Sequence, residues 1–343
     1  MRRKFFLLSI ILIAVIKVIA QESTFSNPLL PSGADPCTSF RKGNFYYTHT
    51  LGDKIALWKT KNLADLKSAK QTIVWNPGKT GQKNIWAPEF HFIRGKWYAY
   101  FAADNGKNES HRMYVLQNSS NDPFKGEWIF KGKIASWTDR WAIDGNVFKY
   151  KRQLYMIWSG WEGPTNERQN IYIAKMKNPT TLDSEYIMIS TPEYDWEKHG
   201  DLNDPGNPPH VNVNEGPQFL KNKKNLFIVY SANGCWTDFY ALGLLTFNGK
   251  KNLMKASSWK KKNEPIFEKS LENEIYAPGY NSFFKSPDGK EDWILFHANS
   301  EPGQGCGNKR SPRAQKFVWN SDGSPNFGIP IKSTVQLNIP AQK

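Results

Sequence analysis

Four acidic residues, Asp35, Glu89, Asp144 and Glu215, stand in similar short motifs, "GADPC", "WAPEF", "AIDGN" and "NEGPQ". The motifs recur roughly every 60 residues, and a fifth, "APGYN", carries Tyr280 in place of an acid. Carboxylates held close together raise one another's pKa, so such a group can contain a protonated acid beside an ionised base. Because acids are depleted from strand interiors, Glu215 before a strand-like run indicates a reagent rather than a structural residue.

The elements around these motifs are strands that repeat in a fixed order. Each motif precedes a Tyr- or Trp-rich alternating run, and a second strand-like run follows. The first runs are 43–50, 95–104, 152–161, 225–234 and 291–300, and the second runs are 54–63, 112–121, 170–179, 240–249 and 313–323. Units of three or more strands with almost no helical pattern predict an all-β, five-bladed β-propeller as a single domain over 21–343. A β-sandwich with coincidental spacing is the alternative.

In a propeller the first strand of each blade lines the central channel. Residues in the same place in different units therefore converge around one axis, although they lie far apart in the sequence. We accordingly expect the four acids to meet in a funnel at the central axis, where an active site would form.

The first twenty residues have a basic start and an apolar run that ends before Lys17. This pattern predicts a signal peptide over 1–20, and hence export to the periplasm or the outside. A membrane anchor is the alternative, but the run is short of the roughly 20 apolar residues that a span needs. No later stretch is long and apolar enough to span a bilayer.

The formal charge of the chain is +15, and the chain stays basic without its leader. Nucleic acid, a membrane surface and an acidic polysaccharide are the partners that such a charge can attract. Export makes nucleic acid the least favoured of them. The lysines also stand scattered in turn-like places such as 221–225 and 260–263, which is typical of solvated loops.

The three cysteines cannot all pair within one chain. Cys235 and Cys306 lie in Gly-rich stretches, "ANGCWTD" and "GQGCGN", and export permits a bridge between them or leaves both free. Cys37 is then the odd residue, which we expect to be buried. The six histidines show no metal-ligand spacing, so we predict no zinc site.

The ordered motifs "GADP", "WAPE", "AIDG", "NEGP" and "APG.NSF", together with "SPRAQKFVW", resemble glycoside hydrolase family 43. Members of this family are five-bladed propeller enzymes that act on arabinose- and xylose-containing polysaccharides. The resemblance extends from about Asn27 to about Pro330. Within the family, the stretches "NIWAPEFHF" and "ANGCWTDFYALGLLTF" look most like those of the α-L-arabinofuranosidases.

The resemblance implies a role for three of the acids. Asp35 would be the general base that activates water, and Glu215 the general acid that protonates the departing glycosidic oxygen. Asp144 would orient Glu215 and keep its pKa high. An inverting enzyme holds its two carboxyl groups roughly 6.5–9.5 Å apart so that a water fits between them. Glu89 receives no catalytic role, and we interpret it as structural.

Three further residues are candidates for substrate binding. Trp86 and Trp161 offer aromatic faces that pack against the apolar face of a sugar ring, with the propeller core as the alternative. Arg313 has a planar guanidinium with several N–H donors, which could reach into the pocket and bind the substrate. A role on the protein surface is the alternative for Arg313.

Two features depart from the family pattern. Many members have His where this chain has Tyr280, and in some of them that His lies beside a cation in the channel. We therefore expect no required cofactor, and Tyr280 weakens the case for a bound calcium. The Pro-rich stretch 201–213 is longer than usual before the acid, and it would reshape the leaving-group side of the pocket.

These observations together favour an exported, inverting glycoside hydrolase. We expect it to release terminal α-L-arabinofuranosyl residues from arabinan or arabinoxylan of plant cell walls. A β-xylosidase of the same fold is one alternative. A non-catalytic carbohydrate-binding propeller is another, which the presence of all three expected carboxylates disfavours.

Overall fold

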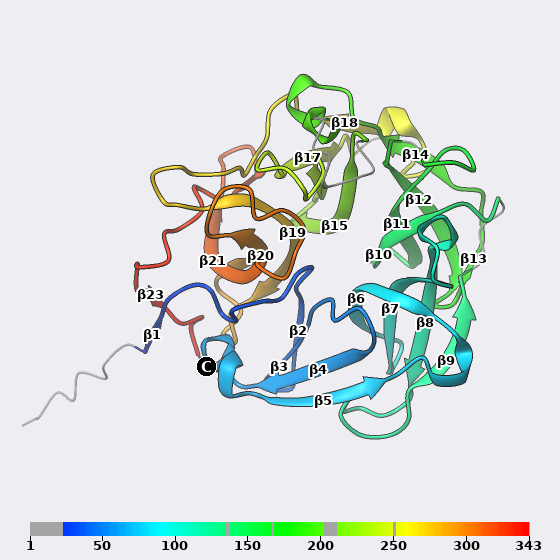
Figure 1. Ribbon diagram of the computed structural model, residues 1–343, viewed down its shortest axis with the longest axis horizontal. Helices are drawn as coiled ribbons and strands as arrows, with labels where there is room; N and C mark the ends of the chain where they lie inside the picture. Colours follow the sequence, from blue (N-terminus) through cyan, green and yellow to red (C-terminus); the bar gives the residue numbers. More distant parts are fainter. Residues whose placement is uncertain (1–22, 135–137, 167, 202–210, 250–251, 343) are drawn as a thin grey trace, which may run out of the picture.

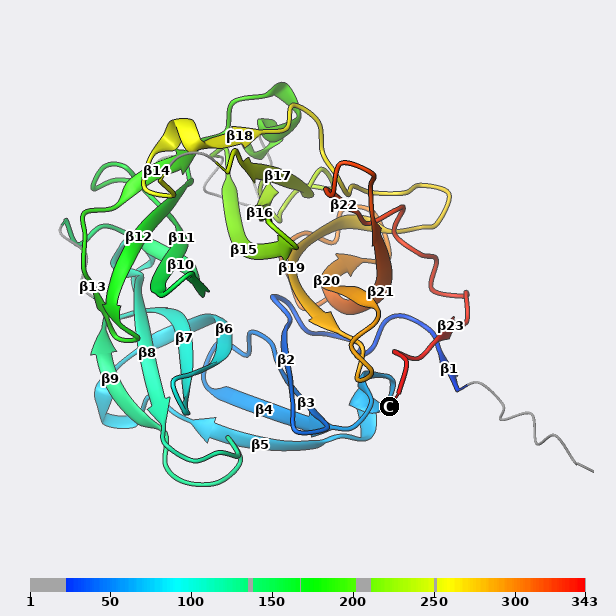
Figure 2. The ribbon, with the colours of Figure 1, turned by 180° about the vertical axis from the view of Figure 1, so that it is seen from behind.

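Five antiparallel sheets surround a central axis in the computed structural model of the chain (Figure 1). The structure describes residues 23–134, 138–166, 168–201, 211–249 and 252–342. Each sheet is one blade, and the view from behind shows the same ring of blades with the first strand of each nearest the axis (Figure 2). The five-bladed propeller is therefore confirmed, and the sandwich alternative is excluded. The predicted leader, 1–20, lies outside the described residues.

The strands follow the chain outward from the axis in every blade. Blade 1 contains β2 (Cys37–Arg41), β3 (Asn44–Thr48), β4 (Ile55–Thr60) and β5 (Lys70–Trp75). Blade 2 contains β6 (Lys83–Ile93), β7 (Lys96–Asp104), β8 (Arg112–Asn118) and β9 (Ile129–Lys133). Blade 3 contains β10 (Ala142–Tyr150), β11 (Gln153–Gly160), β12 (Asn170–Asn178), β13 (Thr181–Leu182) and β14 (Ile187–Ser190).

Blades 4 and 5 complete the ring. Blade 4 contains β15 (Asn214–Asn222), β16 (Asn225–Ala232), β17 (Ala241–Phe247) and β18 (Trp259–Lys261). Blade 5 contains β19 (Tyr276–Lys285), β20 (Asp292–Asn299), β21 (Ser311–Trp319) and β22 (Pro325–Asn326). The helices of the described residues are short 3-10 turns: η1 (Leu63–Ser68), η2 (Gly78–Thr80), η3 (Asn108–Ser110), η4 (Asp195–Glu197), η5 (His199–Asp201) and η6 (Ala256–Ser258).

Hydrophobic clusters lie between neighbouring blades, all the way around the ring. Strand β11 shows why the second strands read as almost continuously apolar. Its Met156 and Trp158 pack toward blade 2, whereas Tyr155 and Ile157 pack toward blade 4. Because side chains alternate along a strand and both faces of each blade are covered, apolar residues are needed at every position.

The inner strands share a backbone irregularity at the sequence motifs. The pairing register shifts within β6, β10, β15 and β19. At the motif of each strand one residue takes the left-handed conformation, with φ of 49° at Ala87, 58° at Asp144, 56° at Gly216 and 44° at Tyr280. Strands β6 and β19 have a second shift, where Asn84 (φ 46°) and Ala277 (φ 48°) take the same conformation. Asp35, just before β2, has the same conformation, with φ of 58°. These bulges turn the start of each inner strand toward the axis.

The left-handed residues correct the register that the motifs suggested. Asp35 and Asp144 occupy equivalent places, but Glu215 precedes the equivalent residue Gly216, and Glu89 follows Ala87 by two. Neither Glu215 nor Glu89 therefore shares the register of Asp35 and Asp144, and Glu89 is the more displaced of the two. Glu89 lies further along its strand, toward the other end of the channel.

The two ends of the described chain close the ring. Strand β1 (Thr24–Phe25) pairs with β23 (Leu337–Asn338), and both lie beside blade 5 and blade 1 (Figure 1). The Asn27 amide exchanges two hydrogen bonds of 2.9 Å with the backbone of Ala314 on β21. The segment that carries Asp35 is thereby fixed to blade 5.

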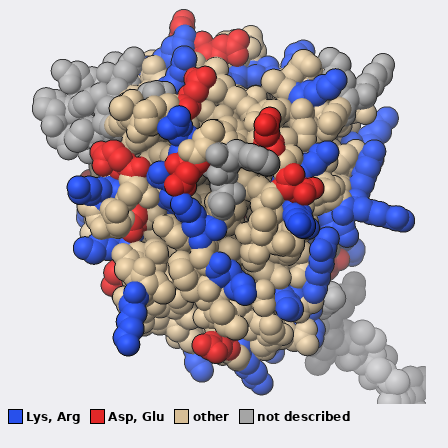
Figure 3. Space-filling model, turned by 90° about the vertical axis from the view of Figure 1, so that its right-hand side faces the viewer, with Lys and Arg blue, Asp and Glu red and all other residues tan. Residues whose placement is uncertain are grey.

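The structure settles the pairing of the cysteines, which the sequence left open, and confirms that Cys37 is buried. Cys235 and Cys306 form a disulfide between the β16–β17 and β20–β21 loops, and Cys37 is a buried free thiol. Figure 3 shows one side of the molecule, where Lys and Arg are spread out and interspersed with Asp and Glu. Among the described residues, no helix has the length and apolar character that a membrane crossing requires.

Candidate active site

Asp35 lies at the end of the channel where the inner strands begin. Its Oδ2 accepts a hydrogen bond of 2.6 Å from the Thr50 hydroxyl, and its Oδ1 is 3.3 Å from Nη1 of Arg310. Only 8% of the residue is exposed. The Thr50 hydroxyl also accepts a bond of 2.7 Å from the backbone N–H of Ala87. Asp35 is thus held by donors from blade 1 and blade 5.

His297, on β20, fixes the backbone of Asp35. Its Nδ1 accepts the Asp35 N–H at 3.0 Å, so the ring proton of the neutral imidazole is on Nε2. The ring is fully buried, and this burial holds the pKa of His297 well below its ordinary value. A neutral imidazole in this place is a structural acceptor rather than a proton donor.

Asp144 lies beside the backbone of the residue that follows Glu215. Its Oδ2 accepts the Gly216 N–H at 3.0 Å, and the residue is 4% exposed. Burial first, and then the negative charge of Glu215, raise the pKa of Asp144 well above its usual range. Asp144 therefore contacts Glu215 through the backbone, which suits a residue that orients an acid.

Glu215 is the third carboxyl group at this end of the channel. Its Oε1 accepts a bond of 2.8 Å from the Tyr240 hydroxyl, and 9% of the residue is exposed. Burial raises the pKa of Glu215 to about 7, helped by the negative charge of Asp35 and opposed by Tyr240 and Arg310. A carboxyl group with this pKa holds a proton near neutral pH and can give it away.

The remaining sequence candidates lie in different surroundings. Trp86 is half-buried and stacks on His111, with ring centroids 3.9 Å apart. Trp161 is buried and stacks on Trp141 at 4.7 Å, which makes it part of the hydrophobic core. Sugar contact at Trp161 thus loses its support, because its face is covered, and a role for Trp86 stays a prediction.

Arg313 is also not at the carboxyl groups. Its guanidinium is buried and donates to Ser333 at 2.8 Å and to Ser300 at 2.7 Å. Burial lowers the pKa of Arg313 to about 10. The guanidinium that reaches Asp35 belongs to Arg310, three positions earlier, so the pocket contact expected of Arg313 is reassigned to Arg310.

Sequence reasoning missed Thr50, Tyr240, His297 and Arg310. A topological signal identifies three of them. The inner strand of each blade runs away from the carboxyl groups and the second strand returns, so the loop after the second strand lies at their end of the channel. Thr50, Tyr240 and Arg310 all stand in such loops.

The opposite end of the channel holds Glu89 in a ring of amides. The Asn146 amide donates to Glu89 Oε2 at 2.7 Å and to Gln218 Oε1 at 3.0 Å, and the Gln218 amide donates to Glu89 Oε1. These residues border a cavity of about 600 Å³ whose lining comes from β2, β6, β10, β15, β19 and their flanks and includes Cys37. Asp35, Asp144 and Glu215 do not line this cavity.

Tyr280 stands between the two ends. It is 3% exposed, its N–H donates to Ser231 Oγ at 2.8 Å, and its φ is 44°. Burial and the charges of Asp144 and Glu89 raise its pKa well above the ordinary value, so the phenol is neutral. Within the described ranges, no group of three or more His, Cys, Asp or Glu side chains is placed to hold a metal ion.

Three buried carboxyl groups at one end of the channel of a five-bladed propeller are the groups that a glycoside hydrolase needs. Comparison with models of known protein families identifies the family to which the chain belongs. The model for glycosyl hydrolases family 43 matches residues 25–325, and the chain belongs to this family.

Characterised relatives and solved structures agree with this assignment. An extracellular exo-α-(1→5)-L-arabinofuranosidase of Streptomyces avermitilis is 35% identical over 91% of the chain, which spans 65% of that relative's length. The protein of the same description from Streptomyces chartreusis is 36% identical over 80% of the chain and 82% of its own length. The crystal structure of an α-L-arabinofuranosidase from Lactobacillus brevis has a TM-score of 0.82 at 33% identity, covering 91% of this chain and 98% of that one.

Proposed function

We propose that this chain is an exported, inverting glycoside hydrolase that removes terminal α-L-arabinofuranosyl residues from arabinan or arabinoxylan. The observation that carries the proposal is the contrast between two carboxyl groups at one end of the channel. Glu215 has its pKa raised to about 7, whereas Asp35 accepts hydrogen bonds from Thr50 and Arg310. Hydrolysis of a glycosidic bond needs one carboxyl group of each kind.

The roles follow from these contacts. Glu215 gives its proton to the departing glycosidic oxygen, so the leaving group departs as a neutral alcohol. Asp35 takes a proton from a water, whose oxygen attacks the anomeric carbon from the opposite face. Asp144 acts through the Gly216 N–H and holds the backbone that carries Glu215. None of these steps requires a cofactor.

The substrate is inferred from the relatives. The two Streptomyces proteins are described as extracellular exo-α-(1→5)-L-arabinofuranosidases, and the Lactobacillus brevis protein as an α-L-arabinofuranosidase. An arabinofuranosyl substrate fits these descriptions better than a xylosyl one. The extracellular location of the relatives also supports export, in agreement with the leader pattern of 1–20.

A sugar-release assay tests the substrate. We expect free arabinose from linear arabinan or arabinoxylan, and faster cleavage of p-nitrophenyl α-L-arabinofuranoside than of p-nitrophenyl β-D-xyloside. Glu215→Gln serves as the control with impaired release of arabinose from the polysaccharides. Preference for the xyloside would assign the chain to the β-xylosidases, and saturable binding of arabinan with no product would make it a binding protein.

Stereochemistry tests the role of Asp35. If a water attacks directly, the first sugar released from an α-linked substrate is the β-anomer, which proton NMR detects before mutarotation. Early appearance of the α-anomer would mean a covalent intermediate, and Asp35 would then be a nucleophile rather than a base.

A further inference from the structure

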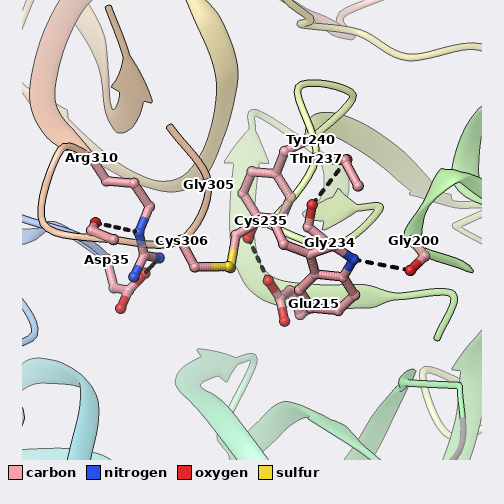
Figure 4. The surroundings of a disulfide bond; sticks show 12 residues. Asp35, Gly200, Glu215, Gly234, Cys235, Thr237, Tyr240, Gly305, Cys306 and Arg310 are labelled. Atoms are coloured by element: carbon pink, nitrogen blue, oxygen red, sulfur yellow. Dashed lines mark hydrogen bonds and ion pairs between the residues drawn. A yellow bond between two sulfur atoms is a disulfide. The ribbon is translucent and has the colours of Figure 1, made fainter. Parts of the chain in front are cut away.

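Two loops meet at the end of the channel that holds the carboxyl groups. The β16–β17 loop contains Cys235 and leads to Tyr240, which donates to Glu215 at 2.8 Å. The β20–β21 loop contains Cys306 and leads to Arg310, whose Nη1 is 3.3 Å from Asp35. Figure 4 shows the disulfide with Arg310 and Asp35 on one side and Tyr240 and Glu215 on the other.

We propose that the Cys235–Cys306 disulfide is a positioning element for the reaction, because it holds Tyr240 against Glu215 and Arg310 against Asp35 at the same time. One covalent link then fixes the acid and the base relative to each other. This inference rests on the roles proposed above for Glu215 and Asp35.

The packing around Tyr240 supports the first half of the inference. Cys235 packs against a small cluster of Ala87, Ala277, Tyr240 and Tyr280, which is the apolar side of the site. The Tyr240 ring is 1% exposed and lies parallel to the His297 ring, with centroids 5.7 Å apart. His297 in turn accepts the backbone N–H of Asp35. Movement of Tyr240 would therefore disturb the surroundings of both carboxyl groups.

The β20–β21 loop supports the second half. It has no regular strand or helix between Asn299 and Ser311, and Gly303 and Gly305 in it have positive φ angles. Glycine leaves the backbone of this loop many conformations. The Arg310 carbonyl accepts the Gly33 N–H at 2.9 Å, which fixes the backbone of Arg310 but not the path of the loop that leads to it. The loop is joined to its neighbour by the disulfide, and also by the Asp238 carboxylate, which accepts the Gly303 N–H at 2.9 and 3.0 Å.

A purely stabilising disulfide is the competing explanation, and the two roles predict different measurements. A stabilising link constrains the unfolded chain, so its loss lowers the melting temperature and leaves the kinetics of the folded enzyme unchanged. A positioning link also changes the chemistry. Tyr240 and Arg310 both lower the pKa of Glu215 against the effect of burial, so their release moves that pKa upward.

The first experiment removes the link from the folded full-length protein. Dithiothreitol reduces the bridge: its two thiols become a cyclic disulfide, and each cysteine sulfur gains one electron and one proton. The double variant Cys235→Ala/Cys306→Ala gives the same state without reductant. At a temperature where circular dichroism shows both forms folded, we expect kcat on p-nitrophenyl α-L-arabinofuranoside to fall about 10-fold to 100-fold, as misplaced groups do. KM should change much less.

Two matched tests distinguish a positioning role of the disulfide from a purely stabilising one. Asp238→Asn weakens the second link, and we expect it to lower kcat little in the oxidised protein but several-fold more in the double cysteine variant. Treating the two reduced thiols with diiodomethane joins the sulfurs through one methylene group and releases two iodide ions and two protons, and it should restore most of the lost kcat. Buried Cys37 is shielded from the reagent, and the oxidised protein treated in the same way is the control.

The decisive readout does not depend on the substrate. In protein labelled with 13C at the glutamate carboxyl groups, Glu215→Gln identifies the Glu215 signal, and its titration midpoint should be higher in the double cysteine variant. Unchanged kcat and an unchanged midpoint, together with a lower melting temperature, would overturn the inference. If the oxidised protein cleaves no arabinofuranoside but the midpoint is still higher in the double cysteine variant, the proposed function alone would be refuted.

Discussion

The two ends of the channel contain buried carboxyl groups with opposite surroundings. Glu89 accepts hydrogen bonds on both oxygens from Asn146 and Gln218, and its Oε2 is 3.1 Å from His91. Among the described residues, Glu215 accepts a hydrogen bond from Tyr240 alone, and it lies near the charges of Asp35 and Asp144. Burial is comparable, at 1% and 9% exposure, so burial alone does not make a reagent. What distinguishes Glu215 from Glu89 is the smaller number of donors that the described residues offer it, together with the neighbouring charge of Asp35.

Removing the acid is the most severe way to test this difference. We expect Glu215→Gln to lower turnover of polysaccharide by about 10²–10⁴, because the general acid is lost. An aryl glycoside with a good leaving group needs less protonation and should lose less. Initial rates on arabinan and on a nitrophenyl arabinofuranoside give the comparison. Equal losses on both substrates would show that Glu215 is not the acid.

The pH dependence follows from the raised pKa. Glu215 must be protonated to act, so kcat/KM should be highest below pH 7 and fall about tenfold per pH unit well above it. Tyr240→Phe removes a hydrogen bond that favours the ionised form, and its alkaline limb should lie at higher pH. A rate profile between pH 5 and 9 for both proteins tests this. An alkaline limb that does not move would mean that another group titrates.

The sequence predicted the ring of strands well, because that ring is recorded in local patterns. Runs such as 152–161 and 225–234 coincide with β11 and β16 to within about two residues, since both faces of each blade require apolar side chains. The register of the motifs was harder to predict. Whether Glu89 occupies the same position in its blade as Asp144 depends on which residue of each strand adopts a left-handed φ. A bulge can move that residue along the strand without changing the amino-acid composition of the motif.

The partners of the acids were the part that the sequence could not predict. Arg310 and Arg313 look alike in "KRSPRAQ", and only the path of a Gly-rich loop decides that Arg310 reaches Asp35 while Arg313 is buried beside Ser300. The contact of Tyr240 with Glu215 likewise depends on how the loop after β16 folds. Such tertiary contacts have no local signature.

At the opposite end of the channel, mutation of Glu89 should lower stability rather than activity. Glu89→Gln replaces an acceptor oxygen by an amide that faces the amides of Asn146 and Gln218. We expect the free energy of unfolding to fall by about 1–3 kcal/mol, as for a disrupted buried network, with kcat within about twofold of wild type. Urea unfolding and the nitrophenyl assay measure the two quantities. A large loss of kcat at unchanged stability would place Glu89 in the catalytic machinery.

The smallest effect is expected from metal removal, and it concerns Tyr280 between the two ends. A neutral phenol is a poor ligand for a hard cation, which prefers several carboxylate, carbonyl or water oxygens. We expect activity to survive prolonged EDTA treatment, and added calcium to shift the melting temperature by about 1 °C or less.

Tyr280→His introduces the residue that many members of the family carry at this place. Histidine also adopts a left-handed φ more readily than most residues, and φ here is 44°. If the phenol is what disfavours a channel cation, this variant should gain a calcium-dependent rise in melting temperature that the wild type lacks. A large loss of wild-type activity in EDTA, restored by calcium, would show instead that other residues hold a functional ion.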